Sequence, residues 1–226
     1  MKLYYIITDS FKNLEEKYFV PSFNKHSPRI ELNAIYYNPP EIVETRFQSP
    51  DWIATLTYKS NIILKLIEDN LGDVIMITDV DMVIVKDIYD YIVESMESKD
   101  ILHQREGYTE DGINAGVTVI KCSEKTKKFF EYVRDSLAEF GGPNYLDQSA
   151  MDDYYKKDNN FLDLEWGYLC SAKIATRYSY DIINSHRDNI MLLHANVTHT
   201  VKEKEEALND FLVWIGSEPG ILLKRR

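Results

Sequence analysis

The sequence predicts an α/β fold with a mixed, mainly parallel central sheet and helices on both faces. Strand-like and helix-like segments alternate along the chain, which favours this class. The short apolar run Val74–Thr78 follows Leu71-Gly72-Asp73 and is typical of a strand buried on both faces. With 226 residues and 44% hydrophobic content, the chain suits one large domain with a real core, which we expect to span 1–226.

The first third of the chain predicts two strands and two helices ahead of the central strand. The segment Lys2–Ile7 is rich in aromatic and β-branched residues, which favour strands, and it ends in the polar Thr8-Asp9-Ser10. Apolar residues recur at helical spacing after Pro50, and Asn70-Leu71-Gly72 is typical of a helix carboxyl end. The predicted elements are a strand over 2–7, a helix over 14–23, a strand over 30–37 and a helix over 50–69.

The rest of the chain continues this alternation. Ser123 is a good N-cap, and the helix that it starts stops before Gly141-Gly142-Pro143. The predicted elements are helices over 88–96, 123–140, 146–155 and 203–215, and strands over 101–103, 117–120, 161–164 and 190–193. The stretch from Trp166 to Asp188 has no clear pattern, so we assign no element there.

Composition excludes several classes of protein. The net charge of −11 lacks the basic balance of a general nucleic-acid binder. Cys122 and Cys170 lie far apart and form neither a disulfide framework nor a metal cluster, which fits a reducing compartment. The apolar stretch at the amino terminus is too short for a signal peptide, and no run approaches a membrane span. We therefore expect a cytoplasmic protein.

Two carboxylates, Asp79 and Asp81, follow the central strand one residue apart. In an extended chain, residues i and i+2 point to the same side, so both can converge at the strand's carboxyl end. Ligands of open α/β sheets bind at that end. Because unpaired carboxylates are costly in apolar surroundings, a divalent metal with a phosphate-bearing ligand would suit them. The alternative is a solvated turn, since Asp-x-Asp alone is common.

Further polar residues lie where other elements meet loops. Lys59, on the helix before the central strand, either reaches a phosphate or is a solvated lysine. Asn114-Ala115-Gly116 would let a ligand approach the backbone closely, and with Asp147-Gln148 it offers groups that hold sugar hydroxyls. The alternatives are a turn for Asn114 and a helix N-cap for Asp147. His194 ends the last strand and either completes a Mn²⁺ site or is only hydrogen-bonded there.

Taken in chain order, these motifs resemble the nucleotide-diphospho-sugar transferases of the GT-A fold. The resemblance is strongest to the retaining branch related to glycogenin and the bacterial galactosyltransferases. It extends from Thr8 to Lys202, and its specificity lies in six motifs in the right order, each at an element boundary. The motifs are Thr8-Asp9, Tyr58-Lys59, Asp79-Val80-Asp81, Asn114-Ala115-Gly116-Val117, Asp147-Gln148 and His194.

The resemblance implies a role for each site residue. The metal, Mn²⁺ or Mg²⁺, would be held by Asp79, Asp81 and His194. The nucleotide would be bound by Thr8, Asp9, Lys59, Asp79, Val80 and Lys202. The donor sugar would be lined by Asn114, Ala115, Gly116 and Asp111, with Asp147 and Gln148 as the catalytic residues. The galactosyltransferase relatives continue past the His with a Gly and then Lys-Pro-Trp. Here no Gly appears before Lys202, so we expect Lys202 to make the phosphate contact.

The predicted function is metal-dependent transfer of a sugar from a UDP-sugar to an acceptor hydroxyl of a glycan or similar molecule, not to nucleic acid. The resemblance implies retention, and inversion would instead need a general base such as Asp147, Asp163 or Glu165. The nucleotide would bind to residues 1–120 and the acceptor mainly to residues 121–226. Two alternatives stay open: a non-catalytic nucleotide- or glycan-binding module of the same fold, and a phosphatase of the haloacid dehalogenase type with Asp79 as nucleophile.

Overall fold

The computed structural model describes residues 1–37, 50–106, 112–142, 144–156, 162–177, 180–196, 198, 200–218, 220 and 222–223. Within them the chain forms a six-stranded sheet in the order β2-β1-β3-β6-β5-β7 and a three-stranded sheet in the order β4-β9-β8. The strands of the large sheet are β1 (Lys2–Ile7), β2 (Glu31–Tyr36), β3 (Val74–Thr78), β5 (Ile101–Arg105), β6 (Ile113–Lys121) and β7 (Trp166–Tyr168). Those of the small sheet are β4 (Met82–Ile84), β8 (Ile174–Thr176) and β9 (Leu192–His194).

The large sheet is mixed and mainly parallel, as expected from the sequence. β1 pairs in parallel with β2 and β3, and β5 pairs in parallel with β7. β6 runs antiparallel to both β3 and β5. Because of this reversal, the amino end of β6 lies beside the carboxyl ends of β3 and β5.

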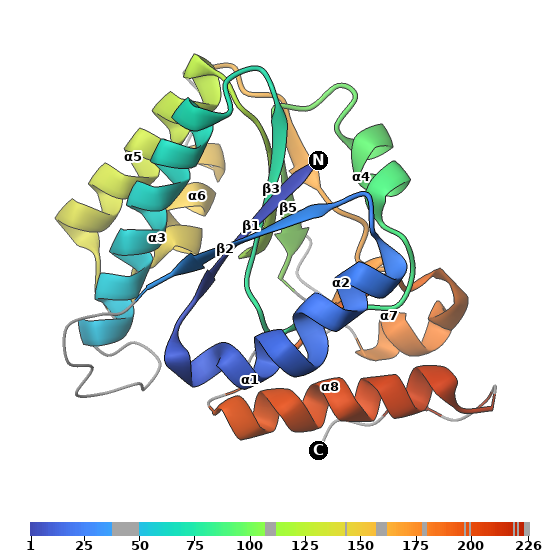
Figure 1. Ribbon diagram of the computed structural model, residues 1–226. Coiled ribbons are helices and arrows are strands. Elements are labelled where there is room, and N and C mark those ends of the chain that lie inside the picture. The colour runs from blue at the N-terminus through green and yellow to red at the C-terminus, as the bar shows by residue number, and fades with distance from the viewer. Residues whose placement is uncertain are drawn as a thin grey trace.

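Helices cover both faces of the large sheet (Figure 1). On one face, Ile75 and Ile77 of β3 pack against α3 (Pro50–Asp69), α5 (Glu124–Phe140) and α6 (Asp147–Lys156). Met76 points to the other face and joins the core under α2 (Val20–His26) and α4 (Tyr89–Ser95). The alternating directions of successive strand residues thus give the sheet two apolar faces.

The carboxy-terminal helix α8 (Val201–Gly216) packs beside the amino-terminal helical segment and the small sheet (Figure 1). Leu208 and Phe211 of α8 share a core with Leu14 and with Leu193 of β9. Thr200 caps α8 by accepting a hydrogen bond from the Glu203 N–H at 3.2 Å. None of the described helices has the length and apolar character needed to cross a membrane.

Three sequence expectations differ from the structure. The strand expected over 161–164 is wrong, because the edge strand is β7 and Asp163 adopts a left-handed φ of 50° that an extended segment does not allow. The helix expected over 14–23 is part of a longer helical stretch, made up of Asp9–Phe11, α1 (Lys12–Leu14), Glu15–Phe19 and α2. The stretch left unassigned holds β7, β8 and α7 (Tyr180–Ser185), followed by a 3-10 turn over Arg187–Asn189.

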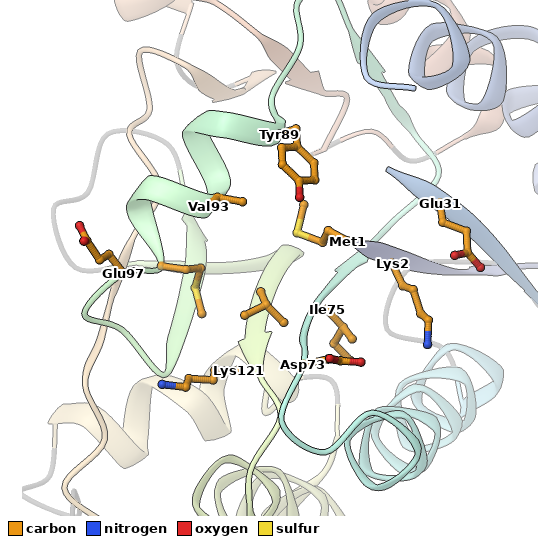
Figure 2. Close-up of a pocket in the computed structure, with 11 residues that line it drawn as sticks. Met1, Lys2, Glu31, Asp73, Ile75, Tyr89, Val93, Glu97 and Lys121 are labelled. Atoms are coloured by element: carbon orange, nitrogen blue, oxygen red, sulfur yellow. The ribbon is translucent and has the colours of Figure 1, made fainter. Parts of the chain in front are cut away.

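A pocket of about 530 Å³ lies at the edge of the sheet where β1, β2 and β3 begin (Figure 2). It mixes apolar, acidic and basic side chains, and its lining includes Lys2, Glu31, Asp73, Tyr89, Val93 and Lys121. None of the residues predicted to bind the metal, the nucleotide or the sugar lines this pocket. The pocket is therefore separate from the predicted site.

Candidate active site

The predicted metal-binding residues meet where β3 ends and the small sheet begins. The Asp79 N–H donates to the Gly116 carbonyl at 2.9 Å, which joins the motif to β6. The Ala195 N–H donates to the Asp81 carbonyl at 2.8 Å, and β4 pairs with β9 so that Met82 faces His194. Backbone hydrogen bonds thus hold residues that are more than a hundred positions apart in the sequence.

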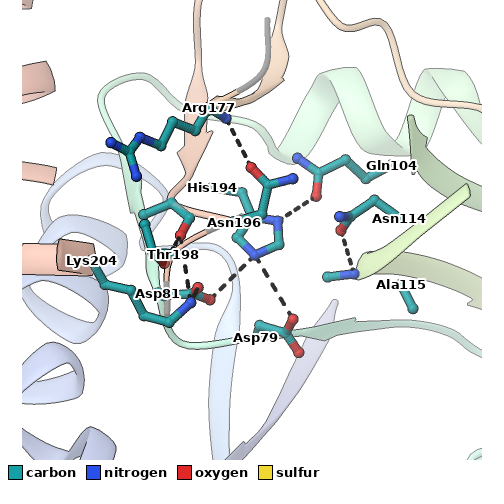
Figure 3. A network of polar contacts seen from close by, with 12 residues as sticks. Asp79, Asp81, Gln104, Asn114, Ala115, Arg177, His194, Asn196, Thr198 and Lys204 are labelled. Atoms are coloured by element: carbon teal, nitrogen blue, oxygen red, sulfur yellow. Dashed lines mark hydrogen bonds and ion pairs between the residues drawn. The ribbon is translucent and has the colours of Figure 1, made fainter. Parts of the chain in front are cut away.

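Asp79, Asp81 and His194 present one ligand atom each within 4.8 Å of one another (Figure 3). The His194 Nε2 lies 3.3 Å from Asp81 Oδ1 and 3.8 Å from Asp79 Oδ2. Asp81 and His194 are buried, whereas the Asp79 side chain is 42% exposed. Two carboxylates and one imidazole are a donor set that Mn²⁺ accepts, with Asp79 open toward solvent and an incoming ligand.

A buried glutamine orients the imidazole of His194. Gln104 Nε2 donates to the Ala175 carbonyl at 3.3 Å, so its Oε1 faces His194 Nδ1 at 2.9 Å. This arrangement assigns the proton to Nδ1 and leaves the lone pair of Nε2 facing the two carboxylates. Three electron-pair donors that face one another can share a cation, and a hydrogen bond made by the other ring nitrogen is typical of metal-binding histidines. The residues therefore fit a divalent ion.

Gly116 makes room for the imidazole. A Cβ at this position would lie 2.2 Å from His194 Cε1 and 2.6 Å from His194 Nδ1. The Gly116 N–H also donates to Asn114 Oδ1 at 2.8 Å. The sequence analysis placed the strand over 117–120, after Asn114-Ala115-Gly116, but the three residues lie within β6, where the absence of a side chain brings the strand close to His194.

Lys59 is mostly shielded from solvent beside Asp79 and is not a solvated helix lysine. Its Nζ donates to Asp79 Oδ1 at 2.9 Å and to the Ala115 carbonyl at 3.1 Å, and its side chain is 13% exposed. Burial lowers the pKa of Lys59, but the carboxylates of Asp79 and Asp147 outweigh it and raise that pKa. Lys59 therefore stays positively charged next to the open carboxylate.

The sequence analysis did not single out a second lysine that is mostly shielded from solvent, Lys204 on α8. Its Nζ donates to Asp81 Oδ2 at 2.5 Å, and its side chain is 15% exposed. Burial raises the pKa of Asp81, but the ammonium group of Lys204 holds it well below its usual range. Lys202, which the sequence analysis favoured, has an 85% exposed side chain that pairs with Glu206 at 4.0 Å. The structure therefore brings Lys204, and not Lys202, to the cluster.

Glu106 connects the residues predicted to bind the sugar. Its carboxylate accepts hydrogen bonds from the side-chain amides of Asn114, Gln148 (3.2 Å) and Asn196 (2.9 Å). The Gln148 amide also donates to the Ile113 carbonyl at 2.8 Å. Asp147 is buried, and this burial raises the pKa of its carboxyl. The sequence analysis missed Glu106 and Asn196, because an isolated Glu or Asn has no local pattern that marks it.

The remaining predicted site residues do not all lie at the cluster of Asp79, Asp81 and His194. Thr8 and Asp9 follow β1, which runs parallel to β3, and the Thr8 and Ser10 hydroxyls lie 2.9 Å apart. Val80 is buried in the core. Asp111 lies outside the described residues. Glu165, named as a possible base for inversion, accepts backbone hydrogen bonds from Asp100 and Ile101, where β5 begins, and therefore lies at the other end of that strand.

Solved structures with the same fold are glycosyltransferases. A glycosyltransferase involved in the glycosylation of the major capsid of PBCV-1 has a TM-score of 0.61 at 13% identity, over 91% of this chain and 98% of that chain. The galactosyltransferase LgtC, in complex with donor and acceptor sugar analogs, has a TM-score of 0.59 at 12% identity, over 98% and 97%. The glycosyltransferase GlyE of Streptococcus pneumoniae TIGR4 has a TM-score of 0.58 at 13% identity, over 98% and 62%.

The fold is therefore that of the GT-A glycosyltransferases, and the acidic motif directly follows β3. A family model of the nucleotide-diphospho-sugar transferases matches residues 24–208, which is more than half of the chain. The chain belongs to this family and is a glycosyltransferase. No curated protein sequence matches it.

Proposed function

We propose that the protein transfers a sugar from a UDP-sugar to an acceptor hydroxyl, that it requires Mn²⁺ or Mg²⁺, and that it retains the anomeric configuration. The observation that supports metal dependence is the cluster of Asp79, Asp81 and His194, whose ligand atoms lie within 4.8 Å of one another. The family supports the nucleotide-sugar donor. It also favours sugar transfer over the phosphatase alternative.

Asp79, Asp81 and His194 would hold the ion, which supplies positive charge to the departing diphosphate. Lys59 adds a positive charge beside Asp79, the carboxylate that is open to solvent. Thr8 and Asp9 would border the base, because they follow the strand next to β3. The backbone at Val80 would line the nucleotide between the two carboxylates.

Asn114, Ala115, Gly116 and Gln148 would line the donor sugar, and we extend the predicted set with Glu106. Glu106 already accepts hydrogen bonds from Asn114 and Gln148, so a sugar hydroxyl could exchange with these contacts. We also keep Asp111, which precedes β6 in the sequence, as a proposed sugar contact. Residues 121–226 would contribute most of the acceptor contacts.

In the proposed reaction, the bond between the anomeric carbon and the diphosphate oxygen breaks, and a bond to the acceptor oxygen forms on the same face of the sugar. The acceptor proton passes to the departing phosphate oxygen, so no separate strong base is needed. Asp147 and Gln148 would stabilise the positive charge that develops on the sugar ring. Asp147 suits this role because it is buried close enough to Lys59 and Asp79 for their charges to affect its pKa.

The test is thermal unfolding with UDP, GDP and other nucleoside diphosphates, each with and without Mn²⁺, followed by hydrolysis assays with the matching sugar nucleotides. We expect UDP with Mn²⁺ to stabilise the wild type by about 3 kcal/mol at a hundredfold excess over Kd. Asp81→Asn should lose this stabilisation. Asp73→Asn, a change of an exposed aspartate at the other end of β3, should keep it.

The wild-type protein gives the decisive result. If no nucleoside diphosphate stabilises it in a metal-dependent way, the proposed function is wrong. Tight metal-dependent UDP binding without hydrolysis or transfer of any sugar nucleotide would instead identify the non-catalytic module considered above.

A further inference from the structure

The lysine that contacts Asp81 lies in an unfavourable position for its own helix. Lys204 is in the first turn of α8, where the helix dipole disfavours a positive charge. Its side chain is 15% exposed, so solvation does little to offset this. Its partners are the Asp81 carboxylate at 2.5 Å and the Ala195 carbonyl at 3.5 Å. The contact with Asp81 therefore accounts for the position of Lys204.

Asp81 divides its two oxygens between two different tasks (Figure 3). Oδ1 faces His194 Nε2 at 3.3 Å and belongs to the candidate metal site. Oδ2 accepts the hydrogen bond from Lys204. A divalent ion held by Oδ1 would thus share one carboxylate with an ammonium group.

Each carboxylate of the motif already has a positive partner before any ion binds. Lys59 pairs with Asp79, and Lys204 pairs with Asp81. A divalent ion would bring two more positive charges next to these two ammonium groups, and their repulsion disfavours binding of the ion alone. A diphosphate beside the ion would supply negative charge and offset that repulsion.

We propose that Lys204 is a resident counterion of Asp81 that competes with the divalent ion, so that the ion binds weakly alone and tightly together with the diphosphate. This inference rests on the proposed function and adds a regulation of the same site. Lys204 acts here as a positioning residue, because it affects the ion through Asp81. Metal and donor binding become coupled, and the coupling is reciprocal, as it must be for any two ligands of one protein.

The experiment is calorimetric titration of the wild type and three variants with Mn²⁺ alone, and with UDP at saturating Mn²⁺. Lys204→Met removes the charge and keeps most of the side-chain length. We expect it to bind Mn²⁺ alone at least about tenfold more tightly than the wild type and to bind UDP at saturating Mn²⁺ less tightly. The coupling factor between the two ligands should therefore fall.

Lys125→Met is the matched control. Lys125 also lies in the first turn of a helix and pairs with a partly buried carboxylate, Asp100, at 2.9 Å, but at the other end of β5. We expect the control to bind both ligands as the wild type does. Lys204→Arg keeps the charge and should restore the wild-type coupling.

Unchanged or weaker binding of Mn²⁺ alone to folded Lys204→Met would overturn the inference. If that variant does not fold, Lys204→Gln takes its place, and unchanged or weaker binding of Mn²⁺ alone to folded Lys204→Gln would overturn the proposal in the same way. A wild type that binds no nucleoside diphosphate at all refutes the proposed function instead, so the two failures are distinguishable.

Discussion

The two carboxylates of the Asp79-Val80-Asp81 motif are two residues apart, yet their surroundings differ sharply. The Asp79 side chain is 42% exposed and pairs with Lys59 of α3, which packs on one face of the large sheet. The Asp81 side chain is 6% exposed and pairs with Lys204 of α8, beside the small sheet. The motif thus combines a carboxylate open to a ligand with a carboxylate that anchors the site in the fold.

The largest expected effect comes from exchanging these two residues in turn for asparagine. Asp81→Asn leaves the buried Lys204 without its carboxylate, and we expect unfolding in urea to show a loss of about 3 kcal/mol. Transfer activity should fall by a factor of about 100 or more. Asp79→Asn should lower the free energy of unfolding by about 1 kcal/mol or less, because the Asp79–Lys59 ion pair is partly solvated and Lys59 keeps its hydrogen bond to the Ala115 carbonyl. Equal losses of stability would show that the two carboxylates do not differ in this way.

A smaller effect is expected from Gly116→Ala, which tests how His194 completes the cluster. The new Cβ would displace an imidazole that lies only 2.2 Å from its position, so Mn²⁺ affinity should fall by about ten- to a hundredfold in a titration with UDP present. Gly167→Ala on β7 is the control, since its Cβ would first meet Leu102 at an ordinary 3.4 Å. Full Mn²⁺ affinity in Gly116→Ala would mean that His194 is not a ligand.

The smallest effect concerns a buried histidine outside the cluster. His103 lies 3.4 Å from the Thr118 hydroxyl and 3.2 Å from the Tyr155 hydroxyl, and burial lowers its pKa to about 3. Because the unfolded chain takes up a proton below its ordinary pKa near 6.5 and the folded chain does not, stability should fall as the pH drops from 6.5 toward 3.

By pH 5 the loss attributable to His103 is about 2 kcal/mol. Urea unfolding at pH 7.5 and pH 5 checks this, and His103→Gln should show a smaller difference between the two pH values. Its Mn²⁺ affinity should match that of the wild type. An equal pH dependence in both proteins would show that His103 does not cause the loss. A smaller pH dependence in His103→Gln would instead separate His103 from His194, whose ring faces the carboxylates of Asp79 and Asp81.

The sequence predicted the features that local patterns encode. The apolar run before Asp79, the helical spacing up to Asp69 and the N-cap at Ser123 each depend on neighbouring residues, and each element forms where expected. His194 was a candidate ligand because it ends a predicted strand, and the resemblance in motif order grouped it with Asp79 and Asp81. Its approach to Asp81 depends on β4 pairing with β9, which local pattern alone does not encode.

What the sequence did not reveal depends on contacts between distant segments. Strands of three residues, such as β8, are too short for a periodic signal. Lys204 is one of several charged residues in α8, and only the packing of that helix beside β4 distinguishes it from Lys202. Glu106 meets Asn114 because β5 ends next to the beginning of β6, whereas Gln104 meets Ala175 and His194 of the small sheet.

The joining of both sheets at the cluster has a consequence for how the protein is made. Asp79 and Asp81 are synthesised early, whereas His194 and Lys204 come from the last fifth of the chain. On the ribosome, the central strands of the nascent chain are therefore synthesised well before His194, the third residue that would bind the metal ion. We therefore expect catalytic competence only after α8 has docked, and we expect products that lack this helix to be inactive even where their central sheet is intact.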